Sequence, residues 1–294
     1  MIYFYQTKPQ KEVFMKKSLT VLKTTINVGL DSPVKLLHVT DTHIALDDDG
    51  KDCGRKRIFD KDFENCSIEY FFEAVEYAKA NGLPILHTGD FFDFLSNNNF
   101  AFADKYLTPL DYIYAAGNHD FCHKVGSAKE DYAYKWEHIK YSAPHIKNNL
   151  YFYSRVIGGV NIVTLDNSYY LMTEGQIELL RAEAAKGLPI VLGVHNPFYN
   201  EEQARKILAT GNPCVYAVGA PEELLATYPP DRRAQQTPDE ATRRAVDYIM
   251  NEPMIKAIIA GHTHLNLEET LPNGIPQITT HGSFAGFVRE ITLI

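Results

Sequence analysis

Residues 34–43 read VKLLHVTDTH, an apolar run that ends in two polar residues able to bind a metal. The apolar and β-branched residues of Val34–Thr40 predict a buried strand. Asp41 and His43 follow it directly. Because alternate residues of an extended chain face the same side, both side chains can turn toward one ion. The stretch therefore predicts a metal-binding turn at the carboxyl end of a strand.

The same arrangement of an apolar strand followed by polar residues recurs four times along the chain. The polar residues are Gly89-Asp90-Phe91-Phe92-Asp93 after Pro84–Thr88, Gly117-Asn118-His119-Asp120 after Tyr112–Ala116, His195 after Pro189–Val194, and Gly261-His262-Thr263-His264 after Ile255–Ala260. Ligands bind at the carboxyl ends of strands in α/β sheets, so we expect all five segments to meet at one place. We expect Gly89, Gly117 and Gly261 to let the backbone turn sharply there.

The residue types in these segments favour a particular class of metal. Aspartate, histidine and an asparagine carbonyl suit Mn²⁺, Fe or Zn²⁺ rather than copper(I). Taken in order, the five motifs D-x-H, G-D-x-x-D, G-N-H-D, a lone H and G-H-x-H resemble the calcineurin-like metallophosphoesterase superfamily. The motifs span Asp41 to His264, most of the chain. The resemblance implies an α/β fold, a four-layer α-β-β-α sandwich of two packed mixed β-sheets flanked by helices.

The resemblance also implies a role for each motif residue. Asp41, His43 and His264 would bind one metal ion, Asn118, His195 and His262 a second, and Asp90 both. His119 would protonate the leaving group, and Asp93 would help to orient His119. Two divalent or mixed-valence ions of Mn, Fe or Zn would be the cofactors. A hydroxide bridging them would attack phosphorus in line.

Apolar periodicity and turn signals predict most of the remaining elements. We expect strands at Thr20–Gly29 and Ile275–Ile294, a hairpin around Gly158-Gly159, and helices at Ser67–Asn81, Thr173–Lys186 and from Thr237 onward with Pro238 in the first turn. Residues 1–33 would form an N-terminal extension and edge strand, and residues 34–294 the metallophosphoesterase domain. Two long segments, Leu46–Glu64 and Tyr199–Pro238, are lids or recognition loops, or else solvated surface excursions.

Several polar residues near the motifs have both a structural and a functional interpretation. For His38 and His87 we favour core or supporting roles, for Cys122 and His123 local packing, and for Asp120 capping of the following turn. Asn196 or His281 could contact the substrate. Arginines could recognise phosphate, but solvation on the surface is the default interpretation for Arg232, Arg233, Arg243 and Arg244.

Composition limits the classes of function. The chain has 294 residues, of which 45% are hydrophobic and 22% charged, and a formal net charge of −8, which gives no basis for non-specific binding of nucleic acid. No apolar run reaches the length of a membrane span. The four cysteines, Cys53, Cys66, Cys122 and Cys214, contain no C-x-x-C pair, which favours reduced thiols in the cytoplasm, although Cys53 and Cys66 could pair.

The expected function is metal-dependent hydrolysis of a phosphate ester. A phosphodiesterase acting on a small or nucleotide-type substrate is the first hypothesis, and a phosphomonoesterase or protein phosphatase is the alternative. A non-catalytic scaffold would have lost ligands, and no motif position has lost one here. A metal-dependent amidohydrolase would leave the G-N-H-D motif without a clear purpose. The sequence leaves the oligomeric state open.

Overall fold

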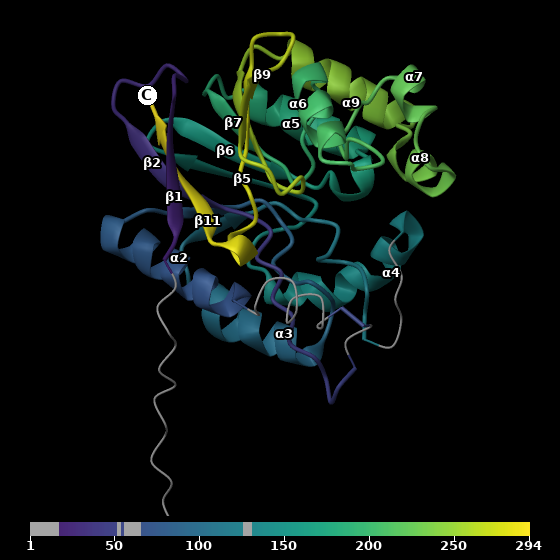
Figure 1. The fold of residues 1–294 in the computed structure, drawn as a ribbon. Coiled ribbons are helices and arrows are strands. Elements are labelled where there is room, and N and C mark those ends of the chain that lie inside the picture. Colours follow the sequence, from purple (N-terminus) through teal and green to yellow (C-terminus); the bar gives the residue numbers. More distant parts are fainter. Residues whose placement is uncertain (1–17, 52–53, 56–65, 126–130) are drawn as a thin grey trace, which may run out of the picture.

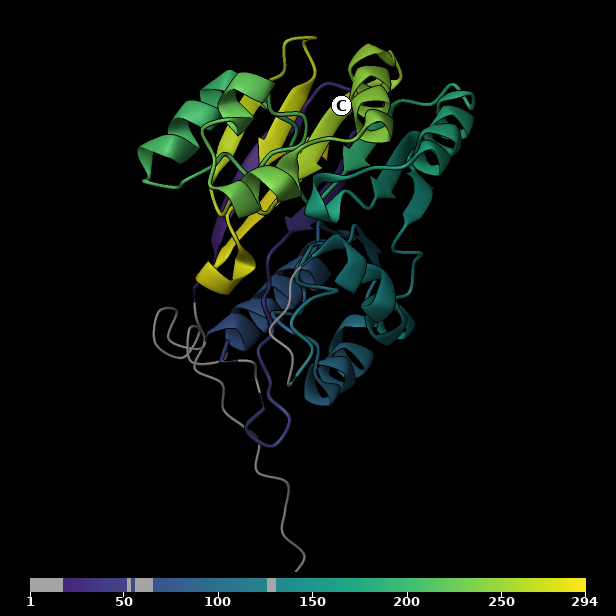
Figure 2. The same cartoon turned by 90° about the vertical axis from the view of Figure 1, so that its right-hand side faces the viewer.

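The computed structural model describes residues 18–51, 54–55, 66–125 and 131–294. Three predictions fall wholly or partly outside these residues. They are the N-terminal extension up to residue 17, the pairing of Cys53, and residues 52–53 and 56–64 of the segment Leu46–Glu64. Two β-sheets lie face to face between layers of helices (Figures 1 and 2). The expected four-layer α-β-β-α arrangement is confirmed.

The first sheet has five strands in the order β1-β11-β2-β3-β4. Strands β2, β3 and β4 run parallel, so their carboxyl ends, from which three of the motifs emerge, share one edge. Strand β11 is antiparallel to β2 and parallel to β1, which lies at the outer edge. The strands are β1 Thr20–Ile26, β2 Val34–Val39, β3 Ile85–His87, β4 Tyr112–Tyr114 and β11 Phe287–Leu293.

The second sheet has six strands in the order β5-β6-β7-β8-β10-β9. Its four central strands are parallel, and the remaining motifs follow β7 and β8. The expected hairpin is the antiparallel pair of β5 and β6. The strands are β5 Phe152–Ile157, β6 Val160–Leu165, β7 Ile190–Gly193, β8 Ile255–Ala260, β9 Leu267–Thr270 and β10 Pro276–Thr279.

Helices cover the outer face of each sheet (Figure 1). On the first sheet these are α2 Ser67–Asn81, α3 Asn97–Phe102 with the π-helical turn Ala103–Leu107, and α4 Tyr132–Ser142. On the second sheet they are α5 Glu174–Ala184 and α9 Glu240–Asn251. The helices α6 Glu201–Ala209, α7 Glu222–Leu225 and α8 Pro230–Gln236 belong to the long segment before α9.

The alternation of side chains in β2 shows how the layers are held together. Leu37 and Val39 pack with Phe71 of α2 in the cluster beneath the first sheet. Leu36 points the other way and packs with Val191 of β7 between the sheets. A third cluster lies between the second sheet and helices α5 and α9. Each buried leucine or valine contributes about 1.5–3 kcal/mol, so both faces of each sheet stabilise the sandwich.

Most of the predicted elements are present, with three corrections. Residues 199–238 are not a simple loop, since three helices form within them. The last predicted helix begins after Asp239, whose side chain accepts a hydrogen bond from Thr242 N, so Pro238 precedes the cap. Strand β9 was not predicted, because its charged sequence LEET lies at a sheet edge. No helix in the described ranges has the length and apolar character needed to cross a membrane.

Candidate metal centre and active site

The five motifs meet where the carboxyl ends of both sheets come together. A cleft of about 590 Å³ opens above them, with His43, Asp90, Asn118, His119, His262 and His264 in its wall. The rest of the wall comes from the long segment that contains α6 and α8 and from Arg55, Tyr170, Thr263, Leu265 and Phe284. The three other predicted site residues lie directly behind the wall, where Asp41 and Asp93 contact His43 and His195 contacts Asn118.

Asp41, His43 and His264, which we call the first trio, bring their ligand atoms within 4.8 Å of one another. Asp41 Oδ2 accepts hydrogen bonds from the Thr40 hydroxyl and from the His262 backbone N–H. Its other oxygen, Oδ1, is buried and receives no hydrogen bond from the part of the chain that the structure describes. His264 Nε2 lies 3.3 Å and His43 Nε2 3.8 Å from that oxygen. Three ligand atoms therefore converge on one point.

Asn118, His195 and His262, the second trio, converge in the same way. His195 Nδ1 lies 2.7 Å from the Thr88 carbonyl, which can only accept, so this nitrogen carries the proton. In the neutral ring, Nε2 then has the available lone pair. This atom lies 3.2 Å from Asn118 Oδ1 and 3.1 Å from His262 Nδ1. His195 is buried, although His262 and Asn118 reach the cleft.

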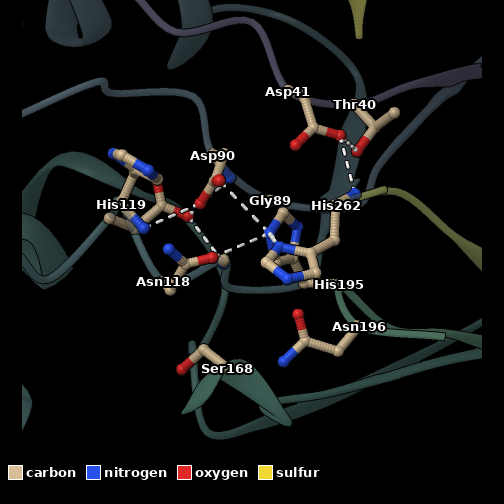
Figure 3. Close-up of polar contacts among 12 residues, drawn as sticks. Thr40, Asp41, Gly89, Asp90, Asn118, His119, Ser168, His195, Asn196 and His262 are labelled. Atoms are coloured by element: carbon tan, nitrogen blue, oxygen red, sulfur yellow. Dashed lines mark hydrogen bonds and ion pairs between the residues drawn. The ribbon is translucent and has the colours of Figure 1, made fainter. Parts of the chain in front are cut away.

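Asp90 lies between the two trios. Its Oδ2 is 3.2 Å from His195 Nε2 in the second trio and 3.8 Å from His43 Nε2 in the first. Figure 3 shows its carboxylate between His119 and Asn118 on one side and the histidine rings on the other. The His119 backbone N–H donates to Oδ1 over 2.8 Å and fixes the carboxylate. Asp90 can therefore contribute to two ion sites at once.

His119 and Asp93 are linked by a hydrogen bond to the Asp93 backbone and by a longer contact with its carboxylate, in which Oδ1 lies 3.6 Å from His119 Nδ1. His119 Nδ1 donates to the Asp93 carbonyl over 2.8 Å, which leaves Nε2 for the cleft. The Asp93 carboxylate accepts from His43 Nδ1 over 3.0 Å and is held by two hydrogen bonds from the Arg55 guanidinium, at 2.7 and 2.8 Å. The ligand atoms of His43, Asp90 and His119 also lie within 4.8 Å of one another.

The backbone of the site is strained at the predicted ligands. Asp41, His43, Asp90, His262 and His264 all have positive φ, between 48° and 67°. Such conformations each cost about 1–3 kcal/mol for non-glycine residues and are typical of functional sites.

Gly117 and Gly261 are required because neighbouring atoms leave no room for a side chain, and not because the backbone is left-handed there. Of the three motif glycines, only Gly89 has positive φ, at 95°. A Cβ on Gly117 would lie 2.1 Å from Asp90 Oδ1, and one on Gly261 would lie 1.9 Å from Thr40 Oγ1. These glycines therefore let Asp90 and Asp41 approach neighbouring strands.

The electrostatics of the site favour positive charge. Burial opposes protonation of His43, but hydrogen bonds to Asp41 and Asp93 outweigh it and raise the pKa of His43 to about 10. Burial is likewise outweighed at His195, where Asp90 raises the pKa to about 9. Burial lowers the pKa of His119 and lowers that of His262 to about 3. Two imidazoles thus hold protons at positions where a cation could take their place.

These residues fit a pair of metal ions. The donor set is carboxylate, imidazole and amide oxygen, which suits Mn, Fe or Zn. The buried Oδ1 of Asp41 faces two imidazole nitrogens, and Asp90 joins the trios. Every predicted metal ligand lies in this one cluster.

The structure also settles several secondary interpretations. Asp120 does not cap the following turn: its buried carboxylate accepts from the backbone of Asp90, Phe91 and Gly117, and from the Tyr114 hydroxyl. Burial, together with Asp90, raises its pKa to about 7. His38 and His87 are buried supports, bonded to the threonines Thr280, Thr88 and Thr42.

The structure supports a substrate contact for neither Asn196 nor His281. The Asn196 side chain is buried and donates to the Asn167 carbonyl. His281 lies behind His264, with ring centroids 6.0 Å apart. Residues that the sequence analysis missed at the site are Arg55, Asn167, Tyr169 and Tyr170, none of which has a motif spacing that would have identified it.

Comparisons with known proteins agree with this geometry. A sequence model of the calcineurin-like phosphoesterase family matches residues 34–266. No curated protein sequence matches the chain. A dimetal phosphatase from Danio rerio is 14% identical, with a TM-score of 0.50, over 85% of this chain and 88% of that one.

Two further solved structures have lower scores. A putative 5'-nucleotidase from Staphylococcus aureus is 13% identical, with a TM-score of 0.45, over 86% of this chain and 49% of its own. The protein TT1561 of Thermus thermophilus is 10% identical, with a TM-score of 0.45, over 85% and 90%. At 14% identity the Danio rerio structure shows a shared fold alone, whereas the family match covers most of the chain. The chain belongs to the calcineurin-like phosphoesterase family, whose members use a dinuclear metal centre.

Proposed function

We propose that this protein is a metal-dependent phosphodiesterase that acts on a small or nucleotide-type substrate. The observation that supports this most directly is the position of Asp90 between two complete ligand trios at the base of one cleft. The first trio would hold one ion, the second trio the other, and Asp90 both. Mn, Fe and Zn all suit these ligands. When bound, such a pair activates water and neutralises charge on the phosphoryl group.

The residues of the chain itself would orient the substrate and move one proton. His119 lies in the cleft wall, and its Nδ1 is fixed by the Asp93 carbonyl. Its Nε2 is therefore the nitrogen that would donate a proton to the leaving oxygen. Nε2 carries a proton only in the charged form of the ring, which burial disfavours by lowering the pKa of His119 and which Asp90 and Asp93 favour. Asp93 would hold His119 through its carbonyl and His43 through its carboxylate.

The long segment at residues 199–238 would provide the recognition surface. Ile207, Thr210, Asn212, Tyr216 and Arg232 line the same cleft as the trios. Ring centroids of Tyr216 and His262 are 5.8 Å apart, and the Arg232 guanidinium lies 5.9 Å from the Tyr216 ring. A cleft of about 590 Å³ is in the usual range for small-molecule sites and is larger than a bare phosphate requires. This space favours a diester, whose second substituent would lie against Tyr216 and Arg232.

A comparison of chromogenic substrates tests this proposal. The metal-free protein is reconstituted separately with Mn²⁺, Zn²⁺ or Fe²⁺ and is given a nitrophenyl phosphodiester, the matching monoester and a nitrophenyl amide. We expect hydrolysis of the diester to exceed that of the monoester, no hydrolysis of the amide, and loss of activity on chelation. Cyclic nucleotides and dinucleotides are the next substrates to test.

Other outcomes would select other functions. Faster hydrolysis of the monoester would make the protein a phosphatase, which is the alternative. Turnover that survives complete removal of metal would overturn the mechanism. A reconstituted protein that binds two ions and hydrolyses none of the substrates would point to a scaffold.

A further inference from the structure

In the second sheet, strands β7 and β8 are each followed by predicted metal ligands. Their neighbour, strand β6, is followed by none. The residues that follow it, Asp166-Asn167-Ser168-Tyr169-Tyr170, connect β6 to helix α5. We call residues 166–170 the brace loop. Although the loop supplies no member of either trio, it contacts every member of the second.

Three contacts join the brace loop to the second trio. The Tyr170 hydroxyl lies 2.7 Å from His262 Nε2. The Tyr169 hydroxyl donates to the Asn118 carbonyl over 3.1 Å. Asn167 Oδ1 accepts from the His195 backbone N–H over 3.2 Å. Side chains of one short loop therefore reach residues that follow β4, β7 and β8, which are far apart in the sequence.

The Tyr170 contact sets the chemistry of His262. His262 Nδ1 points at His195 Nε2, 3.1 Å away, on the side where the ligand atoms converge. The opposite nitrogen, Nε2, meets the Tyr170 hydroxyl, which can accept its proton. A cation at Nδ1 requires the ring proton to be on Nε2, where the Tyr170 hydroxyl can accept it. Partners of this kind fix the tautomer and orientation of a metal-binding histidine.

The loop is itself held rigidly. Tyr169 and Tyr170 are buried, and both have positive φ, 59° and 64°. Two adjacent residues in this conformation are costly and persist only where surrounding contacts fix them. Asp166 provides such contacts: its Oδ1 accepts from the backbone and hydroxyl of Ser168, and its Oδ2 pairs with Lys135 of α4. The side chains of Lys135 and Asp166 are each 2% exposed, so the ion pair is buried.

We propose that the brace loop positions the second trio for metal binding and has a selective effect on that one ion site. The first trio is held by different groups, namely Asp93 on His43 and Thr40 on Asp41. Tyr169 and Tyr170 are therefore positioning residues that act through Asn118 and His262. This inference rests on the proposed role of the trios as metal sites, but not on the substrate.

Removal of single hydroxyl groups tests the inference. Tyr170→Phe, Tyr169→Phe and the double variant keep the buried rings, so we expect them to fold. Tyr112→Phe is the matched control, because Tyr112 is also buried and its hydroxyl accepts from the Lys147 backbone away from the cleft. Mn²⁺ binding is followed by calorimetry, and electron paramagnetic resonance distinguishes a coupled ion pair from a single ion.

The wild type and Tyr112→Phe should bind two Mn²⁺ ions. In Tyr170→Phe one of the two should bind about 10–100-fold more weakly, as is usual when a partner of a metal-binding histidine is removed. Tyr169→Phe should have a smaller effect in the same direction. Equal weakening of both ions, or unchanged affinity in the double variant, would overturn the proposal.

Asn167→Ala provides a second route to the same answer through His195. It should weaken the same ion as Tyr170→Phe, and weakening of the other ion would also count against the brace loop. Because these measurements need no substrate, a wild type that binds two ions but cleaves no phosphate ester would leave the inference intact while refuting the proposed function.

Discussion

The two trios offer similar ligand atoms but are supported in different ways. In the first trio, His264 stands at the cleft with its side chain 39% exposed, and His43 is held by Asp93, which is itself held by Arg55. In the second trio, His195 is fully buried and the brace loop contacts all three members. We expect an ion at the first trio to exchange faster, because solvent and chelators reach His264. Burial and outer contacts therefore distinguish the two sites, in addition to the Asp41 carboxylate of the first trio and the Asn118 amide of the second.

The largest effect should come from the residue that the two trios share. Asp90→Asn removes the carboxylate charge that faces both, so both ions should be lost together. Activity should fall on the order of 10³-fold or more, since a metal pair supplies several kcal/mol of transition-state stabilisation. Calorimetry with Mn²⁺ and turnover of a phosphodiester check this. Asp104→Asn, an exposed aspartate paired with His145, is the control, and retention of two tightly bound ions by Asp90→Asn would contradict a shared role.

His119→Asn should separate proton transfer from metal binding. We expect both ions to remain while turnover falls about 10²–10⁴-fold, because the leaving oxygen loses its proton donor. The loss should be largest for an alkyl leaving group and small for nitrophenolate, which needs no proton. Loss of one ion in this variant would show instead that His119 is a third ligand beside His43 and Asp90.

Arg55→Ala should affect the first trio alone. Without the guanidinium, the Asp93 carboxylate loses two hydrogen bonds and fixes His43 less firmly, so one ion should bind roughly tenfold more weakly. Arg155→Ala is the control, because Arg155 pairs with Asp111 through two contacts at the surface. When Arg55→Ala is combined with Tyr170→Phe, the affinity for each of the two ions should fall by as much as in the corresponding single variant. If both substitutions lowered the affinity for the same ion, the two trios would not be supported separately.

The smallest effect should be the release of protons on metal binding, one from each trio. The pKa of His43 is raised to about 10 and that of His195 to about 9, so both are protonated at neutral pH in the metal-free protein. A bound cation requires the neutral ring, so about two protons should leave when both ions bind. Calorimetry in buffers with different ionisation enthalpies counts them. Affinity should fall as the pH falls, and binding that is independent of pH would contradict these assignments.

Parts of the fold differ in how far the sequence predicts them. Helix α2 was predicted at its observed bounds because its apolar period is clear and Gly82 ends it in a left-handed conformation. Strand β8 was predicted equally well from a continuous apolar run. Strand β9 and helices α3, α4 and α6–α8 were not predicted, because their sequences are polar, charged or interrupted by proline and depend on packing against neighbours.

The sequence by itself determined the ligand types, their order, and their placement after strands. It did so because a strand needs an apolar run and a metal needs particular side chains, and both requirements are local. Only the tertiary structure decided that Asp90 lies between the trios and that Asp120, Arg55 and the brace loop support them. A supporting contact depends on distance across the fold and can be made by many residue types. It therefore leaves no fixed spacing in the chain.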